Sequence, residues 1–353
     1  MAAGSTRSGR TTLATVAASA GVSVATVSKV LNGRHDVAPA TRAKVADLLA
    51  RHDYVGRSGH PPGTPARSRP SVELVFDDAL NAYALEVVQG VLDAGVEADV
   101  AVALSARARA GRGAEARHPM AWAHDLAAAG RQAVITMVDA LTVRHVTALA
   151  RLRLPIVVVD PVELPHARVT SVGSTNFAGG VAATRHLLEL GHRCIGYIGG
   201  PGTATPSQAR LHGFRAAMEA AGVPVPDDVV VAGHFRYQDG IDAGASLLDR
   251  PDRPTAVFAG CDEAAVGLVE AARLRGLRVP EDLSVVGFDD TQLARYASPP
   301  LTTVRQPLRE MGGVALRTAL RLAAGERLDS HHVELATELV IRHSTAPPAG
   351  LRR

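Results

Sequence analysis

The segment Thr12–Gly33, TLATVAASAGVSVATVSKVLNG, decides the fold of the N-terminal part of this 353-residue chain. Leu13, Val16, Ala17 and Ala20 have the spacing i, i+3, i+4, i+7. This spacing marks one apolar face of a helix. Gly21 suits the left-handed position that ends such a helix, and Ser23 suits the N-cap of the next one. Two helices joined by Gly21-Val22-Ser23 form a helix-turn-helix.

The second helix, Val24–Leu31, turns small and polar side chains away from its inward-facing valines. Such a face beside a basic surface suits a helix whose N-terminal residues enter the major groove of DNA. Its candidate contacts to base edges, phosphates or thymine methyl groups are Val24, Ala25, Thr26, Ser28, Lys29 and Asn32. The alternative is a small helical bundle with an ordinary polar face.

The next segment predicts a third helix and then a linker. Pro39 fits the first turn of a helix that runs to about His52, because the missing N–H of proline costs nothing there. Residues 56–70 alternate glycine and proline among arginines, a composition typical of a linker.

The charge of the chain is divided unevenly between its two ends. Residues 1–70 contain ten basic and three acidic side chains, a net charge of +7, whereas the other 283 residues contain 28 and 32, a net charge of −4. A small basic head on a mildly acidic body indicates that the head meets a polyanion. A solvated basic tail would give the same count.

The composition excludes several classes of protein. With 46% hydrophobic and 21% charged residues the chain is not disordered throughout, and no apolar run reaches the roughly 18 residues of a membrane span. The charged N-terminus has no apolar core after it, unlike a secretory signal peptide. Cys194 and Cys261 lie far apart and lack a metal-ligand spacing. We therefore expect a cytoplasmic protein without a metal ion, a cofactor or a membrane partner.

From Ser71 onward, short β-branched runs alternate with helix-period stretches. Continuous apolar strands between helices predict a parallel sheet covered on both faces, and there are too many units for one sheet. The expected fold class is an all-α helix-turn-helix head plus an α/β body of two doubly wound lobes, with a ligand cleft at the carboxyl ends of the strands. The strands are predicted at Val72–Phe76, Ala133–Met137, Ile156–Asp160, Cys194–Gly199, Val229–Ala232, Ala256–Ala259 and Leu283–Phe288.

Three charged residues fall where such a cleft would lie. Asp160 and Asp289 each end an apolar strand, and Arg210 follows a glycine-rich turn. Charged planar groups can make the paired hydrogen bonds that a sugar needs. A carboxylate after a strand also often caps the next helix, which is the alternative for Asp262 and Asp290.

The head resembles that of the lactose-repressor (LacI/GalR) family of transcription regulators over residues 12–17 and 20–33, and the similarity continues to Tyr54. In the body it includes the landmarks 195–200, 285–290 and 300–307. The resemblance implies a periplasmic-binding-protein-like body whose chain crosses between the lobes three times, near 160–163, 289–291 and 320–324.

For DNA binding, the resemblance implies that Val24, Ala25 and Lys29 are the main base readers. It also implies that phosphates or the helix geometry are held by Thr12, Ser23, Thr26, Ser28 and Asn32. The family usually has arginine where Lys29 stands, and lysine loses the bidentate contact to guanine. The family's linker also carries a leucine that wedges into the minor groove, and residues 55–69 contain none.

The resemblance further implies an effector pocket formed by Asp77, Tyr83, Asp160, Arg210, Phe235, Cys261 and Asp289. Phe235 matches the aromatic ring on which a sugar stacks, although a plain core position is the alternative. Cys261 stands where the family often has asparagine or aspartate. Because a thiol lacks the strong hydrogen bonds of an amide, we expect the effector to differ from the commonest sugars.

These observations predict a DNA-binding transcription regulator, a homodimeric repressor on a near-palindromic operator, with a sugar effector in the cleft. The expected regions are a disordered N-terminus at 1–11, the helix-turn-helix domain at 12–55, the linker at 56–70, the body at 71–345 and a disordered tail at 346–353. The first lobe is expected to take about 71–160 and 292–320, and the second about 163–290 and 322–344.

A solute-binding protein and an α/β enzyme are the alternatives, because both could use the same cleft. The former would need export and would have no use for a basic head. For the latter, Gly199, Gly200 and Gly202 do not form G-x-G-x-x-G, and no Walker loop, G-x-S-x-G or H-E-x-x-H occurs. We therefore expect no catalytic residue.

Overall fold

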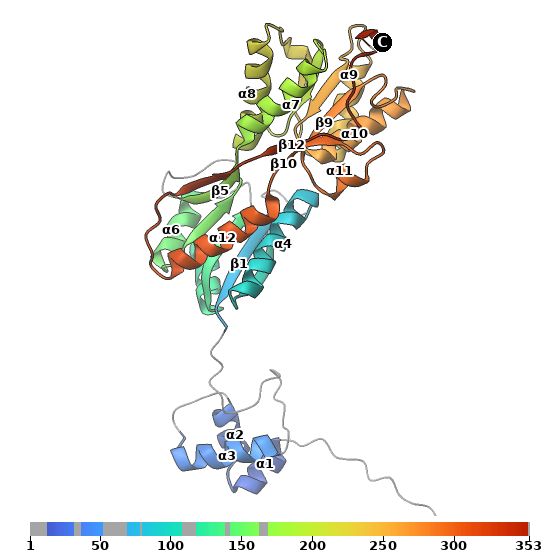
Figure 1. Ribbon diagram of the computed structural model, residues 1–353. Coiled ribbons are helices and arrows are strands. Elements are labelled where there is room, and N and C mark those ends of the chain that lie inside the picture. Colours follow the sequence, from blue (N-terminus) through green and yellow to red (C-terminus); the bar gives the residue numbers. More distant parts are fainter. Residues whose placement is uncertain are drawn as a thin grey trace, which may run out of the picture. The chain divides into compact units, whose positions relative to one another are not determined.

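The computed structural model describes residues 13–31, 37–51, 69–77, 80–107, 118–137, 142–161 and 169–351. The chain divides into two compact units, residues 1–68 and 69–353 (Figure 1). The predicted N-terminal segment 1–11, the linker as far as residue 68, and the candidate DNA contacts Thr12 and Asn32 lie outside the described residues.

The described part of the first unit consists of α1 (Leu13–Ala20), α2 (Val24–Leu31) and α3 (Pro39–Arg51). Gly21 has a φ of +69° and ends α1 in the left-handed conformation. The Ser23 hydroxyl accepts a hydrogen bond from the Thr26 backbone N–H at 3.1 Å, so it caps α2. The common core consists of Val16, Ala17, Ala20, Val27, Val45 and Leu49. The predicted helix-turn-helix is thus confirmed.

The two helices of this motif meet at 100°. Within the described residues, no single helix is both long enough and apolar enough to cross a membrane. Only α1 and α2 taken together, as a pair bent at the turn, meet both conditions.

The body holds two six-stranded sheets, one in each lobe (Figure 1). The order is β11-β5-β4-β3-β1-β2 in the first and β12-β10-β9-β8-β6-β7 in the second, and only β12 pairs antiparallel. The strands are β1 (Ser71–Asp77), β2 (Ala101–Arg107), β3 (Arg131–Met137), β4 (Ile156–Val159), β5 (Thr170–Ser174), β6 (Ile195–Ile198), β7 (Val230–Val231), β8 (Ala256–Ala259), β9 (Ser284–Asp289), β10 (Thr302–Arg305), β11 (His332–Leu335) and β12 (Glu338–Val340).

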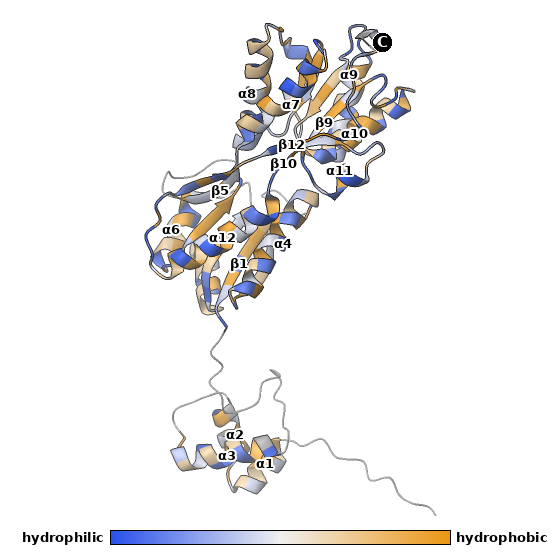
Figure 2. Ribbon diagram, viewed as in Figure 1, coloured by the Kyte–Doolittle hydropathy of each residue, from blue (hydrophilic) through white to orange (hydrophobic). Residues whose placement is uncertain are grey.

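Helices cover both faces of each sheet, as the apolar strands predict. In the first lobe, α4 and α12 bury one face and α5 and α6 the other. In the second, α9 and α10 bury one face and α7 and α8 the other. Figure 2 shows that β1 and β9 are largely hydrophobic, as strands with two covered faces must be. The helices are α4 (Ala82–Glu97), α5 (Pro119–Ala128), α6 (Val143–Arg151), α7 (Asn176–Glu189), α8 (Thr205–Ala220), α9 (Tyr237–Leu248), α10 (Asp262–Leu274), α11 (Gln292–Tyr296) and α12 (Leu308–Ala323), with two short 3₁₀ turns at Asp227–Val229 and Ala349–Leu351.

The expected lobe boundaries and crossing points were wrong. β5 continues the first sheet beyond residue 160, and β10 belongs to the second sheet although it was assigned to the first lobe. The chain therefore crosses at Thr175, at Gln306-Pro307 and at Ala336-Thr337. The reason is that β5 and β10 are short and rich in serine and threonine, so they lack the apolar run that marks the other strands.

The prediction that residues 346–353 form a disordered tail was also wrong for Ala346, which begins that segment. The Ala346 backbone N–H donates to the Ser284 hydroxyl at 3.0 Å, and its carbonyl oxygen lies 2.9 Å from His192 Nε2. Because His192 is buried, its ring nitrogens need partners, and the C-terminal segment supplies one of them.

Glycines allow the paired helices to approach closely, which gives a first prediction. A Cβ at Gly213 of α8 would lie 2.3 Å from the Phe177 carbonyl oxygen of α7, so Gly213→Ala must push the two helices apart. We expect the free energy of unfolding in urea to fall by roughly 1–3 kcal/mol. Gly202→Ala is the control, since no atom lies within 4 Å of its Cβ position. Equal stability of the two variants would contradict the prediction.

Candidate functional site

The first candidate site is the outer face of α2. Ser23, Val24, Ala25 and Lys29 are exposed there, while Val27 on the opposite side is fully buried. The hydroxyls of Ser23 and Thr26 lie 2.9 Å apart at the start of the helix, so both take part in the N-terminal cap. The structure thus places the described candidate contacts, including Ser28, on α2 or, for Ser23, at its N-cap, and the core residue Val27 fixes which face the helix presents.

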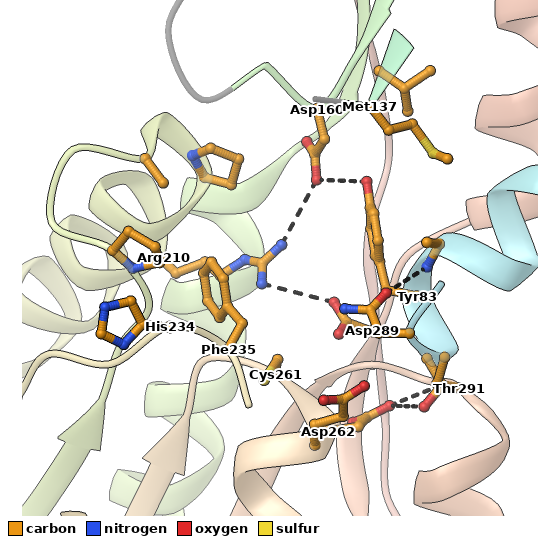
Figure 3. Close-up of a pocket in the computed structure, with 18 of the residues that line it drawn as sticks. Tyr83, Met137, Asp160, Arg210, His234, Phe235, Cys261, Asp262, Asp289 and Thr291 are labelled. Atoms are coloured by element: carbon orange, nitrogen blue, oxygen red, sulfur yellow. Dashed lines mark hydrogen bonds and ion pairs between the residues drawn. The ribbon is translucent and has the colours of Figure 1, made fainter. Parts of the chain in front are cut away.

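The second candidate site is a cavity of about 220 Å³ between the lobes. The first lobe contributes the end of β4 and the first turn of α4, and the second contributes α8, the start of α10 and the end of β9. Six of the seven predicted effector residues line it: Tyr83, Asp160, Arg210, Phe235, Cys261 and Asp289 (Figure 3). The side chain of the seventh, Asp77, lies outside the described part of the structure.

Arg210 stands at the centre of this cavity. Its Nε donates to the Asn176 side-chain oxygen at 2.8 Å, and Nη1 donates to the Gly260 carbonyl oxygen at 2.6 Å. Its guanidinium carbon lies 3.9 Å from the centre of the Phe288 ring. These contacts hold the buried guanidinium plane in one orientation, with its remaining N–H groups directed between the lobes.

Two carboxylates flank the guanidinium, one from each lobe (Figure 3). Asp160 Oδ2 lies 3.9 Å from Nη2, and Asp289 Oδ1 lies 3.7 Å from Nη1. Both distances are longer than a hydrogen bond. Asp160 instead accepts a hydrogen bond from the Tyr83 hydroxyl at 3.1 Å, and Asp289 accepts one from the Gln306 amide at 2.6 Å.

The backbone at the cavity is strained. Asp160, Phe235 and Asp289 have φ angles of +49°, +61° and +116°, a region that residues other than glycine rarely occupy. Strain of this kind costs about 1–3 kcal/mol per residue and concentrates at ligand sites. At these three positions it points the side chains of the strand ends and of the loop toward Arg210.

Burial disfavours charge on the acids of the cavity. It raises the pKa of Asp160, and that of Asp289 further, although the Arg210 guanidinium lowers both. Burial also raises the pKa of the Tyr83 hydroxyl and of the Cys261 thiol, so both stay protonated. The cavity therefore offers a cation, a phenol and carboxyl groups, an arrangement suited to exchanging hydrogen bonds with a polar ligand.

Asp262 gives a prediction on pH. Burial raises its pKa to about 7, against hydrogen bonds from Thr303 and Thr291 that lower it. An aspartate in the unfolded chain titrates near 4. Between these values the folded protein retains a proton that the unfolded chain has lost, so its stability falls as the pH rises from about 4 to about 7. Urea unfolding from pH 5 to pH 8 should show this fall.

The matched variant is Asp262→Asn, which has the same shape and no titration. We expect a smaller loss of stability with rising pH in this variant, although Asp160 and Asp289 still contribute in the same direction. An unchanged slope would show that Asp262 is ionised across this range.

Several residues of the cavity were not predicted. Asn176 orients Arg210 and lies 3.4 Å from Asp160 Oδ1, and Met137 and Glu263 line the wall. Asp262, given helix capping as its alternative role, accepts hydrogen bonds from the Thr291 backbone N–H at 2.7 Å and the Thr303 hydroxyl at 2.6 Å. Its position beside Cys261, shortly after the apolar run of β8, was the available signal. Cys261 also caps α10, since its Sγ accepts from the Ala264 N–H at 3.4 Å.

Comparisons with known proteins cover both units. Residues 12–56 match the family described as bacterial regulatory proteins, lacI family, and residues 184–345 match the periplasmic binding protein-like domain. The HTH-type transcriptional regulator DegA of Bacillus subtilis is 33% identical over 344 residues, which cover 96% of this chain and 99% of DegA.

Two solved structures are similar over nearly the whole chain. The complex of the transcriptional regulator CelR with cellobiose is 33% identical, with a TM-score of 0.70, and covers 95% of this chain and 100% of CelR. The lac repressor dimer bound to operator and the anti-inducer ONPF is 25% identical, with a TM-score of 0.70, and covers 96% of this chain and 100% of that one.

Proposed function

Because this chain belongs to the lacI family of bacterial regulatory proteins, we propose that it is a homodimeric repressor whose operator affinity is changed by a sugar bound between the lobes. Its relatives over the full length are transcription regulators, so the chain is a DNA-binding regulator and not an enzyme. The helix-turn-helix head, which a solute-binding protein would not need, also sets that alternative aside.

The observation that carries the sugar proposal is the gap on either side of Arg210. A hydroxyl group both donates and accepts, so one placed there can accept from the guanidinium and donate to a carboxylate. The distances of 3.9 Å to Asp160 and 3.7 Å to Asp289 leave both groups able to turn toward such a hydroxyl. Phe235, whose ring lies 5.4 Å from the guanidinium carbon, supplies an apolar face. The cellobiose of the CelR complex agrees with this class of ligand.

The operator proposal follows from the single recognition helix. One α2 helix can read only a few base pairs, so two copies on two half-sites are needed for specificity. The lac repressor crystallised as a dimer on its operator, which supports the same arrangement here. The net charge of +7 in residues 1–70 supplies attraction to the phosphates, and a cytoplasmic location follows from the need to reach DNA.

The coupling between the two sites is a difference in affinity. A sugar that touches Asp160 on one lobe and Asp289 on the other favours the lobe arrangement in which both contacts are made. If that arrangement separates the two heads from the half-site spacing, the sugar is an inducer; if it brings them to that spacing, the sugar is a co-repressor.

The test is fluorescence anisotropy of the full-length protein on DNA from its own upstream region. A scrambled duplex and a panel of sugars are included at near-physiological salt, because non-specific binding depends steeply on salt. We expect tight binding to the upstream DNA alone, shifted in one direction by one sugar. Equal binding to both duplexes, with no effect of any sugar, would contradict the proposal.

A further inference from the structure

A second cavity, of about 390 Å³, adjoins the one that holds Arg210. It lies among β5, β11 and the first turns of α7 and α8. Asp160 and Pro206 line both cavities, so these two residues lie between them. The first cavity alone is smaller than the roughly 300–1,000 Å³ usual for ligand sites, whereas the second falls within that range.

The two oxygens of the Asp160 carboxylate lie beside residues of different cavities. Oδ2 accepts the hydrogen bond from Tyr83 and is the oxygen nearest to Arg210, both in the first cavity. Oδ1 lies 3.4 Å from the Asn176 amide nitrogen and faces Gly173, and these two residues line the second cavity. A ligand that extends past Asp160 can therefore keep a polar contact on each side of it.

The second cavity also carries an aromatic surface. Phe177, the second residue of α7, lines it and is 49% exposed, which is unusual for a phenyl ring. The other polar side chains that line it are the hydroxyl-bearing Ser171, Ser174, Thr175 and Thr205 and the imidazole of His332. An exposed ring among hydroxyl groups fits a sugar, which presents an apolar face and a rim of hydroxyls.

The charges here disfavour an anionic ligand. The carboxylate of Glu334 lines the second cavity, and no lysine or arginine of the described residues does. A phosphate or carboxylate group on the ligand would meet negative charge without a cation to pair with.

We propose that the second cavity is a subsite for a further, uncharged sugar unit, so that the effector is a disaccharide or longer oligosaccharide. One unit lies between Arg210 and Asp289, and the next passes Asp160 and stacks on Phe177. This inference depends on the proposed function, because it needs a sugar in the first cavity.

The experiment is isothermal titration of the full-length protein with glucose, galactose and mannose and with neutral disaccharides and trisaccharides that contain them. We expect a disaccharide to bind at least tenfold more tightly than its best monosaccharide. Phe177→Leu keeps an apolar side chain but removes the ring, and should remove most of that advantage while leaving monosaccharide affinity unchanged. Phe177→Tyr keeps the ring and should restore it.

The outcomes separate the two proposals. If monosaccharides bind and disaccharides bind no better, or if Phe177→Leu weakens both equally, the second subsite is wrong and the sugar site stands. If no sugar of either length binds, the proposed sugar effector fails and the subsite fails with it.

Discussion

Arg210→Ala is expected to lower the affinity for the effector sugar by at least about 100-fold, while operator binding in the absence of sugar stays unchanged. The guanidinium provides two charge-assisted hydrogen bonds to the ligand in the proposed site, and such bonds are worth about 1.5–3 kcal/mol each. The head is a separate compact unit and contains none of the residues that contact Arg210, so the variant keeps its DNA-reading surface.

The measurement is the sugar-induced shift in operator affinity, followed by anisotropy, together with the thermal unfolding curve. Removing a buried cation leaves Asp160 and Asp289 without their counter-charge, which destabilises the body. Arg210→Lys therefore accompanies it, because lysine retains the charge but cannot present the planar fork. We expect this variant to fold and to bind sugar more weakly. A folded Arg210→Ala protein with a normal sugar response would remove Arg210 from the site.

Lys29→Ala is expected to weaken operator binding by roughly 10- to 100-fold and to relax the preference for operator over scrambled DNA. Lys29 is exposed on α2, beside the exposed Val24 and Ala25, where a side chain can reach base edges in the major groove. Loss of a base contact reduces specific binding more than non-specific binding, so the ratio of the two affinities should fall.

The matched control is Lys44→Ala, since Lys44 is an exposed lysine of the same head on α3. Both variants lose one positive charge, so any effect of charge on DNA affinity is common to both. Anisotropy on both duplexes at several salt concentrations separates this common part from base reading. If the two variants lower the operator-to-scrambled ratio equally, Lys29 contacts only phosphates. Lys29→Arg should retain or sharpen the preference, because arginine can contact guanine with two hydrogen bonds.

The local signals in the sequence predicted the elements better than the topology. The head could be predicted almost to the residue, because the apolar spacing, the glycine turn and the serine cap act within a few residues of one another. The two-sheet class followed from continuous apolar strands. The crossings did not, because they depend on which strand pairs with which, and β5 and β10 pair through their backbones with little apolar character of their own.

In the candidate site, too, some features could be predicted from local sequence and others depend on contacts between distant residues. Asp160 and Asp289 end strands, and their convergence on Arg210 could be expected from the edge of the sheet at which parallel strands finish. The orientation of Arg210 could not, because it depends on Asn176, the Gly260 carbonyl and the Phe288 ring, which are 34, 50 and 78 positions away in the chain. Those contacts arise only after the second lobe has folded.

The three crossings between the lobes lie side by side. Ser174, next to the first, donates to the side-chain oxygen of Gln306 at the second, and Thr175 lies 3.0 Å from Thr337 of the third. Three connecting segments that are hydrogen-bonded to one another restrict the relative movement of the lobes more than a single segment would. Gln306 also donates a hydrogen bond to Asp289, so the carboxylate that faces the cavity is bonded to one of the three crossings. In the proposed site, a sugar that contacts Asp289 therefore acts directly on the segments that connect the lobes, and not on a part of either lobe far from them.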